Sequence, residues 1–362
     1  MISRGATTIC CNGAQLQDAI RRVKSASVEL EVSTDVLADD GRWEIPSECY
    51  RHVHIRVVRL TGRERISENL LAQPFIRFSI STTQELSLPT CRFISGQIDL
   101  RLDKVAHNLR KLELQAKQIS ILADHDARWK ENITNLTVCN IAWPTCSSSP
   151  IHFSRLESLT FGGNISHFHV LHLPALRSLS VLESPTQCSA HPWSSSTIRK
   201  QFPALQTIKV EDADSGWLTA LDLPVLRVFT LEQMYRDAIK REVRSLRLPP
   251  SPVERINIQV GDHRLFTQES LRAMPLLKHV VFEMWGELSW EKDVLAMFFE
   301  AGDIPCPHLE WIQFPKARPY DAALANYIAD ILRSIEALGL SSLRFIAIHW
   351  SDQGFIRYWR EL

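Results

Sequence analysis

Three histidines close together in the sequence are of a residue type that can bind a metal ion. His167, His169 and His172 fall within six residues, and alternate residues of an extended strand point to one side, so the first two would face the same way. Imidazole nitrogens are common zinc ligands. No cysteine or carboxylate lies at ligand spacing beside them, and histidines in a polar connecting segment need no metal. We therefore expect no bound metal, and keep a metal-assisted hydrolytic site as the alternative.

Two further segments carry residue types found in catalytic or nucleotide sites. Asp124, His125 and Asp126 could orient a general base, but a triad needs a nucleophile brought close by the fold, and no motif identifies one. Gly162 and Gly163 form an isolated pair after a predicted strand, without the glycine spacing of Rossmann or P-loop motifs. The sequence therefore predicts a protein that is not an enzyme and that binds no cofactor.

A short apolar motif recurs along most of the chain. It predicts the repeated elements that position these residues. It reads apolar, two variable residues, apolar, one variable residue, apolar, as in Leu109–Leu114. Ten copies are present, and successive copies begin 20 to 34 residues apart. This pattern, at spacings of about 20–29 residues, is typical of leucine-rich repeats. The copies begin at Leu109, Ile133, Leu156, Leu176, Leu205, Leu226, Val253, Leu277, Leu309 and Leu343.

Half of the copies also carry a proline two residues before the first apolar position. Proline fixes its own φ and biases the preceding residue toward extended backbone, so we expect it to end a connecting segment and lead into a strand. The last two apolar positions alternate about one variable residue, as in a short strand with one buried face. The prolines are Pro174, Pro203, Pro224, Pro275 and Pro307.

Parallel stacking of these strands would bury an apolar face that no single repeat can bury alone. The sequence therefore predicts an α/β fold, a leucine-rich-repeat-like solenoid in which an irregular arc of parallel strands carries helices and loops on its convex side. The last of three predicted helices is the clearest, because its apolar residues recur at intervals of three and four and Gly339 follows as a stop signal. The helices are predicted at residues 268–274, 289–300 and 320–337.

The first hundred residues carry weaker signals of the same array. An amphipathic helix is predicted over residues 14–24, and the segment 1–26 is expected to be helical. Strand-like runs follow at residues 28–32, 53–57 and 75–80. We expect the array to fill residues 27–362, with degenerate repeats over 27–105, clearer repeats over 106–350 and a C-terminal cap over 351–362.

Composition and charge limit the environment and the partners. Forty-one basic residues balance 41 acidic ones, so the chain lacks the long-range field that steers proteins onto nucleic acid or anionic membranes. No stretch approaches the roughly 20 apolar residues that cross a bilayer, and residues 1–13 lack the apolar run of about 7–15 residues that a secretory signal requires. The eight cysteines are scattered, without a Cys-x-x-Cys pair. We expect a cytoplasmic or nuclear protein that binds neither nucleic acid nor membrane.

Three segments of the array are similar to the irregular repeats of a known protein family. They are residues 173–181 (Leu-Pro-Ala-Leu-Arg-Ser-Leu-Ser-Val), 202–210 (Phe-Pro-Ala-Leu-Gln-Thr-Ile-Lys-Val) and 306–314 (Cys-Pro-His-Leu-Glu-Trp-Ile-Gln-Phe). From Leu109 onward, and more loosely from Ala19, the chain resembles the F-box/leucine-rich-repeat-like proteins of mushroom-forming fungi. Residues 19–30 are similar to the helix, linker and strand that often precede that family's array. The resemblance implies substrate recognition within a Skp–cullin type ubiquitin ligase.

The chain departs from this family at the F-box, the helical module that docks to the Skp adaptor. No Leu-Pro-x-Glu-like opening followed by three short helices is visible, and the nearest phrase, Trp43–Glu48, lies between predicted strands. Either the chain lost or never had an F-box, or one lies upstream of this gene product. The Skp adaptor and cullin are expected partners only in the last case.

The variable residues inside each strand would point to the concave face and offer a protein-binding surface. Toward the C-terminus this face would gather aromatic residues, which are common anchors in protein recognition. Alternatively, the tail residues Phe355, Tyr358 and Trp359 cover Trp311 and Phe345 as a cap. The candidate partner-binding residues are Lys111, Glu113, Lys209, Arg255, His279, Trp311, Phe345 and His349.

The sequence thus predicts a non-catalytic repeat protein that binds another protein. The family resemblance implies that it is the substrate-recognition part of a Skp–cullin–F-box type ubiquitin ligase. The alternatives are a metal-assisted hydrolase that uses the arc as a scaffold, a scaffold protein unrelated to ubiquitination, and a remnant with only a structural role.

Overall fold

The computed structural model shows a parallel-strand β-solenoid, which confirms the predicted repeat solenoid. The chain divides into two compact units, residues 1–176 and 177–362, which are described separately. The structure describes residues 7–10, 27–33, 47–51, 53–61, 65–66, 74–88, 92–93, 107–115, 128–141, 151–163, 171–182, 200–211, 216–232, 248–260, 267–284, 291–299, 305–315, 322–333, 342–350 and 354–359.

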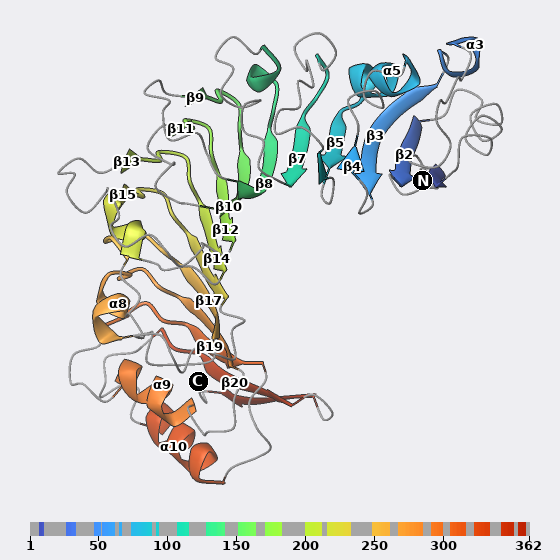
Figure 1. Ribbon diagram of the computed structural model, residues 1–362. Helices are drawn as coiled ribbons and strands as arrows, with labels where there is room; N and C mark the ends of the chain where they lie inside the picture. Colours follow the sequence, from blue (N-terminus) through green and yellow to red (C-terminus); the bar gives the residue numbers. More distant parts are fainter. Residues whose placement is uncertain are drawn as a thin grey trace. The chain divides into compact units, whose positions relative to one another are not determined.

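In the first unit, parallel strands pair side by side in the order β1-β2-β3-β5-β7-β8-β10 (Figure 1). They are β1 Thr7–Cys10, β2 Ser27–Ser33, β3 His54–Thr61, β5 Glu85–Leu88, β7 Lys111–Gln115, β8 Asn135–Ile141 and β10 Ser158–Gly163. Two-residue parallel ladders join β4 Arg65–Ile66 to β6 Arg92–Phe93, and β9 Ile151–His152 to β11 Leu171–His172. The helical elements are α3 Ser47–Tyr50, α5 Pro74–Thr82 and the 3-10 helix η1 Arg128–Glu131.

In the second unit, parallel strands pair in the order β12-β14-β16-β17-β18-β19-β20, and β21 adds antiparallel to β20. Figure 1 shows the helices of this unit to one side of the strands. The strands are β12 Ser178–Leu182, β14 Thr207–Glu211, β16 Val228–Glu232, β17 Arg255–Val260, β18 His279–Met284, β19 Trp311–Phe314, β20 Phe345–Trp350 and β21 Gly354–Trp359. The other elements are the ladder of β13 Lys200–Gln201 with β15 Leu221–Asp222, the 3-10 helix η3 Gly216–Ala220, α8 Gln268–Arg272, α9 Glu291–Phe299 and α10 Ala322–Arg333.

The apolar motif accounts for the strands and for the core. All ten predicted copies form strands, each beginning at the variable residue before the second apolar position. Leu179, Ile208 and Phe229 lie in register on β12, β14 and β16, and each is fully buried. The residues between the apolar positions of these strands stay partly exposed, which gives the alternation expected of a sheet with one buried face. Burial of the motif residues is the main source of stability in the array.

Within each unit, a shared carbonyl aligns most described repeats with the next one at the point where the strand begins. The amides of Gln206 and Thr207 both donate to the Arg177 carbonyl oxygen, at 2.9 and 3.0 Å. One repeat later, Arg227 and Val228 donate in the same way to Gln206. The same geometry recurs at the carbonyls of Gln84, Arg110, Thr134, Arg227, Glu254 and Lys278. Each of these carbonyl oxygens thereby uses both lone pairs where the next strand starts.

The recurring prolines occupy one position of a tight turn. In Leu173–Leu176 the amide of Leu176 donates to the Leu173 carbonyl oxygen at 3.3 Å, which makes Pro174 the second residue of a β-turn. The other four prolines, Pro203, Pro224, Pro275 and Pro307, have the same bond across them, at 3.1 to 3.3 Å. Proline suits this position because its fixed φ matches the turn. The turn, rather than proline alone, directs the chain into the strand.

The predicted strand at residues 75–80 is wrong, because these residues belong to helix α5. Pro74 opens the helix, a position where its missing N–H costs nothing. Phe75 and Phe78, three residues apart, meet Tyr50 on one face, with ring centroids 5.2 and 4.9 Å from the tyrosine ring. The strand that pairs with β3 is instead β5.

The three predicted helices of the second unit are present as α8, α9 and α10, with shorter bounds. Thr267 caps α8, since its hydroxyl oxygen accepts the Ser270 amide at 3.3 Å. Between β7 and β17, the described parts of the connections hold short strands and 3-10 helices but no α-helix, so the α/β character predicted for the whole array is not confirmed. None of the described helices is long and apolar enough to span a membrane.

The sequence predicts a helical segment over residues 1–26. In the structure this segment is not purely helical. Residues Thr7–Cys10 form β1, which pairs in parallel with β2. The helix predicted at residues 14–24 lies outside the described residues. The strand predicted at residues 28–32 is confirmed as β2, and the one at 53–57 as β3 with later bounds. The sheet therefore begins before residue 27, although the sequence analysis expects the array to start at residue 27.

Replacing Ile208 with alanine tests whether the stacked motif residues carry the stability. Ile208→Ala leaves a cavity between Leu179 and Phe229, so we expect the free energy of unfolding to fall by about 2–5 kcal/mol. The control Thr207→Ala alters the adjacent, partly exposed side chain and should cost less than about 1 kcal/mol. Urea denaturation followed by tryptophan fluorescence measures both values. Equal losses in the two variants would contradict the assignment of the core.

Candidate functional site

The variable strand residues form columns on the partly exposed face of each sheet, as predicted. In the first unit, Lys111 is in register with Asn135, and Glu113 with Thr137. In the second unit, Arg255, His279 and Trp311 are successive partners on β17, β18 and β19. The parallel register therefore brings together residues that lie up to 56 positions apart in the sequence.

The row formed by Arg255, His279 and Trp311, here called the aromatic row, is the main feature of the second unit's polar face. The imidazole of His279 meets the Trp311 ring edge-on, with centroids 5.0 Å apart and planes at 83°. This is the edge-to-face arrangement that aromatic rings favour. His279 remains 37% exposed, and Trp311 is partly exposed as well. Among the described residues, both rings of the aromatic row are thus partly exposed.

The charge state of His279 follows from its surroundings. Burial lowers the pKa of His279 below its ordinary value of 6.5, and the nearby charges of Arg255 and Lys278 lower it further. Glu310, whose Oε2 lies 3.8 Å from Nε2 of His279, opposes this shift without reversing it. The imidazole is therefore neutral at pH 7. A neutral ring is less costly to desolvate than a charged one when a second surface covers it.

Arg255 is held in place by a chain of polar contacts across two strands. Its Nε donates to Oδ1 of Asn257 at 3.1 Å, and Nδ2 of Asn257 donates to the Thr230 hydroxyl oxygen at 3.2 Å. Asn257 and Thr230 are register partners on β17 and β16. Part of the side-chain entropy of Arg255 is therefore lost on folding, so less remains to be lost on binding.

Lys209 sits between two carboxylates on the same face. Its Nζ is 2.6 Å from Glu211 and 2.8 Å from Glu232, the latter on the neighbouring strand. Burial lowers the pKa of Lys209, but the two carboxylates outweigh that effect and raise it overall. Lys209 therefore stays charged while its charge is compensated locally. It lies two strands from Arg255 and does not contact the aromatic row in the described structure.

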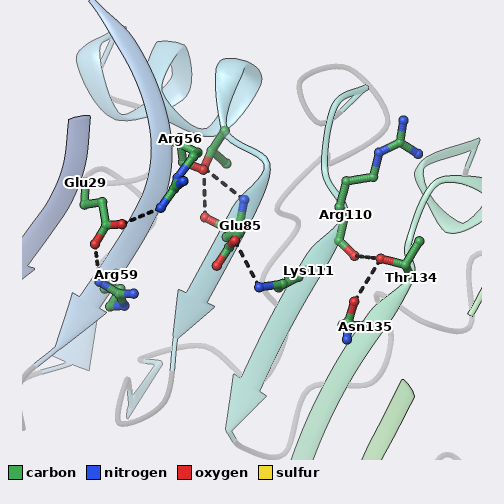
Figure 2. Close-up of polar contacts among 9 residues, drawn as sticks. Glu29, Arg56, Arg59, Glu85, Arg110, Lys111, Thr134 and Asn135 are labelled. Atoms are coloured by element: carbon green, nitrogen blue, oxygen red, sulfur yellow. Dashed lines mark hydrogen bonds and ion pairs between the residues drawn. The ribbon is translucent and has the colours of Figure 1, made fainter. Parts of the chain in front are cut away.

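In the first unit, the candidate residues Lys111 and Glu113 also pair with neighbours. Lys111 Nζ lies 3.1 Å from Glu85, and the Ser87 hydroxyl donates to Glu113 at 2.6 Å. One strand pair further along, Glu29 accepts from Arg56 at 2.8 Å and from Arg59 at 3.3 Å, as Figure 2 shows. The polar face of this unit is thus a series of cross-strand charge pairs.

The sequence analysis missed four residues on the polar face of the first unit. They are Glu29, Arg56, Arg59 and Glu85. Glu85 lies in an eleventh copy of the motif, Thr83–Leu88, in which threonine replaces the first apolar residue. Thr83 is fully buried, and its hydroxyl lies 2.8 Å from the carbonyl oxygens of both Arg56 and Glu85. Allowing a small polar residue at that position would have revealed the copy, because its spacing of 26 residues from Leu109 fits the array.

The remaining candidates are only partly described. Phe345 and His349 lie in β20, where Phe345 is in register with Trp311, but their side chains are outside the described ones, as are those of Phe355, Tyr358 and Trp359. The alternative that the tail residues cover Trp311 and Phe345 as a cap therefore stays a prediction. Backbone pairing places β21 against β20 and not against β19.

The residues singled out for catalytic or metal chemistry fall into three groups. His167, His169 and Asp124–Asp126 lie outside the described residues, whereas His172 ends strand β11. Gly162 and Gly163 lie inside β10 rather than between a strand and a helix, which is not the geometry of a phosphate-binding loop. Within the described ranges, no group of three or more His, Cys, Asp or Glu side chains is arranged to hold a metal.

Among the described residues, Cys306 carries a thiol that is buried and not a nucleophile. Burial raises the pKa of Cys306 to about 12, so the thiol is protonated at neutral pH. Its Sγ lies 3.8 Å from the Leu271 carbonyl oxygen and 3.9 Å from that of Met274, at the end of helix α8. The thiol therefore contributes to packing of the helix end.

No protein-family model matches the chain, and no curated protein matches it with significant similarity. The functional interpretation therefore rests on the chain's own residues. The described structure joins aromatic, cationic and hydrogen-bonding groups on the polar face of the second unit.

The charge pairs of the first unit predict a defined response of stability to pH. The hydrogen bonds from Arg56 and Arg59 lower the pKa of Glu29 below its ordinary value of 4.5. The pairing therefore stabilises the fold above about pH 4.5, and this contribution is lost as the pH falls through the lowered pKa. Glu29→Gln should cost about 1 kcal/mol or less near pH 7, because the arginines are partly exposed.

Urea denaturation of wild type and Glu29→Gln between pH 3 and pH 7 measures this difference. The gap between the two proteins should close at the acidic end of the series. Glu131→Gln, at an exposed position of η1, is the matched control and should leave the profile unchanged. A gap that stays constant over the whole range would rule out the ionised pair as its cause.

Proposed function

We propose that this chain is a non-catalytic binding protein that recognises another protein through the polar sheet face of its second unit. The observation that carries the proposal is the aromatic row, in which the register aligns Arg255, His279 and Trp311 side by side. Arginine and tryptophan are among the residues that most often dominate protein–protein binding energy. The ordered guanidinium and the neutral imidazole both lower the cost of covering this surface.

The repeat pattern supports a leucine-rich-repeat-like assignment within this proposal. Ten motif copies form parallel strands, most of them at the spacing typical of such repeats. The described parts of the connections hold fewer helices than regular members of the class, so we treat the array as an irregular one. In this interpretation, helices and loops occupy the convex side and the aromatic row lies on the concave side.

The family resemblance extends the proposal to a cellular role. We propose that the chain acts in the cytoplasm or nucleus as the substrate-recognition part of a Skp–cullin–F-box type ubiquitin ligase. The protein bound at the aromatic row is then the substrate. Binding to the Skp adaptor would depend on an F-box encoded upstream.

Affinity capture from lysate with paired variants tests the binding surface. The variant Arg255→Glu/Trp311→Ala removes the outer members of the aromatic row, while Arg333→Glu/Leu276→Ala makes matched changes at exposed positions on α10 and on a turn. We expect a protein recovered by wild type and by the control to bind the row variant at least tenfold more weakly, measured by quantitative mass spectrometry and then by titration. Equal recovery by both variants would exclude the row as the binding surface.

The ligase role has a separate readout in the same experiment. Capture is repeated with the chain extended upstream at its gene locus. Enrichment of the Skp adaptor and cullin with either version supports the ligase role. Enrichment of a row-dependent partner without them would exclude that role and leave a scaffold protein unrelated to ubiquitination.

A further inference from the structure

Two histidines of the first unit lie side by side on a ladder separate from the main sheet. β9 and β11 pair in parallel, with Ile151 opposite Leu171 and His152 opposite His172. The imidazole ring centroids are 4.8 Å apart, and the ring planes are inclined at 57°. Both histidines are exposed. They come from sequence positions 20 residues apart and meet only because the repeats are in register.

The backbone fixes the direction in which both rings point. Ile151 and Phe153 flank His152 and are buried, and Leu171 and Leu173 flank His172 in the same way. Because alternate residues point to opposite sides of a strand, both imidazoles must face outward on the same side. The Phe153 amide donates to the His172 carbonyl oxygen at 3.1 Å, which locks the register of the pair.

We propose that His152 and His172 form a two-histidine site for a divalent transition-metal ion such as Zn²⁺. A Zn–N bond of about 2.0–2.1 Å places each imidazole centroid roughly 3.2 Å from the metal, so two rings at a tetrahedral angle have centroids about 5 Å apart. The observed 4.8 Å matches that separation. Binding would require rotation about the side-chain bonds that aims one nitrogen of each ring at a shared ion.

Two protein ligands leave the remaining coordination positions to water. The site is therefore open, unlike the closed four-ligand sites that hold structural zinc. Its effect on the chain is to bridge β9 and β11, a ladder of only two residues in each strand. A bound ion would thus brace the two short strands of this ladder within the first unit. This inference does not depend on the proposed binding function.

Metal titration of the full chain, prepared without a histidine tag, tests the site. Zn²⁺ affinity is measured by competition with a chromophoric chelator for wild type, His152→Ala and His172→Ala. Each substitution removes one of two ligands, so we expect each to weaken binding at least tenfold. His54→Ala and His308→Ala remove exposed imidazoles from β3 and from a turn and should leave the affinity unchanged.

Pulsed electron paramagnetic resonance with Cu²⁺ counts the imidazoles bound to the metal in the wild-type chain. Two equivalent imidazoles in the wild type, and fewer in each single variant, support the site. A single imidazole in the wild type overturns it, and so do equal Zn²⁺ affinities of wild type and both single variants. The wild-type count does not depend on how well any variant folds.

Discussion

The carbonyl shared at the start of each strand is the constraint on which the structure depends. At eight described strand starts one oxygen accepts two successive amides of the next repeat, as Arg177 does for Gln206 and Thr207. A shift of one residue would break this bond pair and turn the apolar motif residues out of the core. Backbone hydrogen bonding and apolar burial therefore favour the same register, and that register decides which variable residues become neighbours.

Much of the fold could be predicted because the motif encodes burial directly. The three apolar positions of each copy recur at fixed spacing, and periodicity alone identifies them as one buried face. Two features escaped this reasoning. Helix α5 depends on the packing of Phe75 and Phe78 against Tyr50, a contact between segments that local alternation does not encode. The copy at Thr83 depends on a buried hydroxyl that finds two carbonyl oxygens, which a search for apolar residues overlooks.

The candidate surface could be predicted as columns but not as interactions. The sequence gives the order of Arg255, His279 and Trp311 along one column, because each occupies the same position of its motif. It does not give the edge-on contact of the two rings, nor the support of Arg255 by Asn257 and Thr230, because these depend on rotamers and cross-strand distances. The pairing of His152 with His172 escaped for a related reason, since it depends on the register of the separate β9–β11 ladder, which the motif does not encode.

The charged side chains on the polar faces of the two units have different partners. This difference favours the second unit for recognition. In the first unit, Glu29 and Lys111 are each paired with opposite charges on neighbouring strands. Covering such pairs removes them from water without offering new partners, which costs free energy. In the second unit, Lys209 is paired in the same manner, but Arg255 donates to the neutral amide of Asn257 and is the register partner of His279. Its guanidinium keeps donors for a partner, so an acidic or carbonyl-rich segment covering the aromatic row could gain charge-assisted hydrogen bonds there.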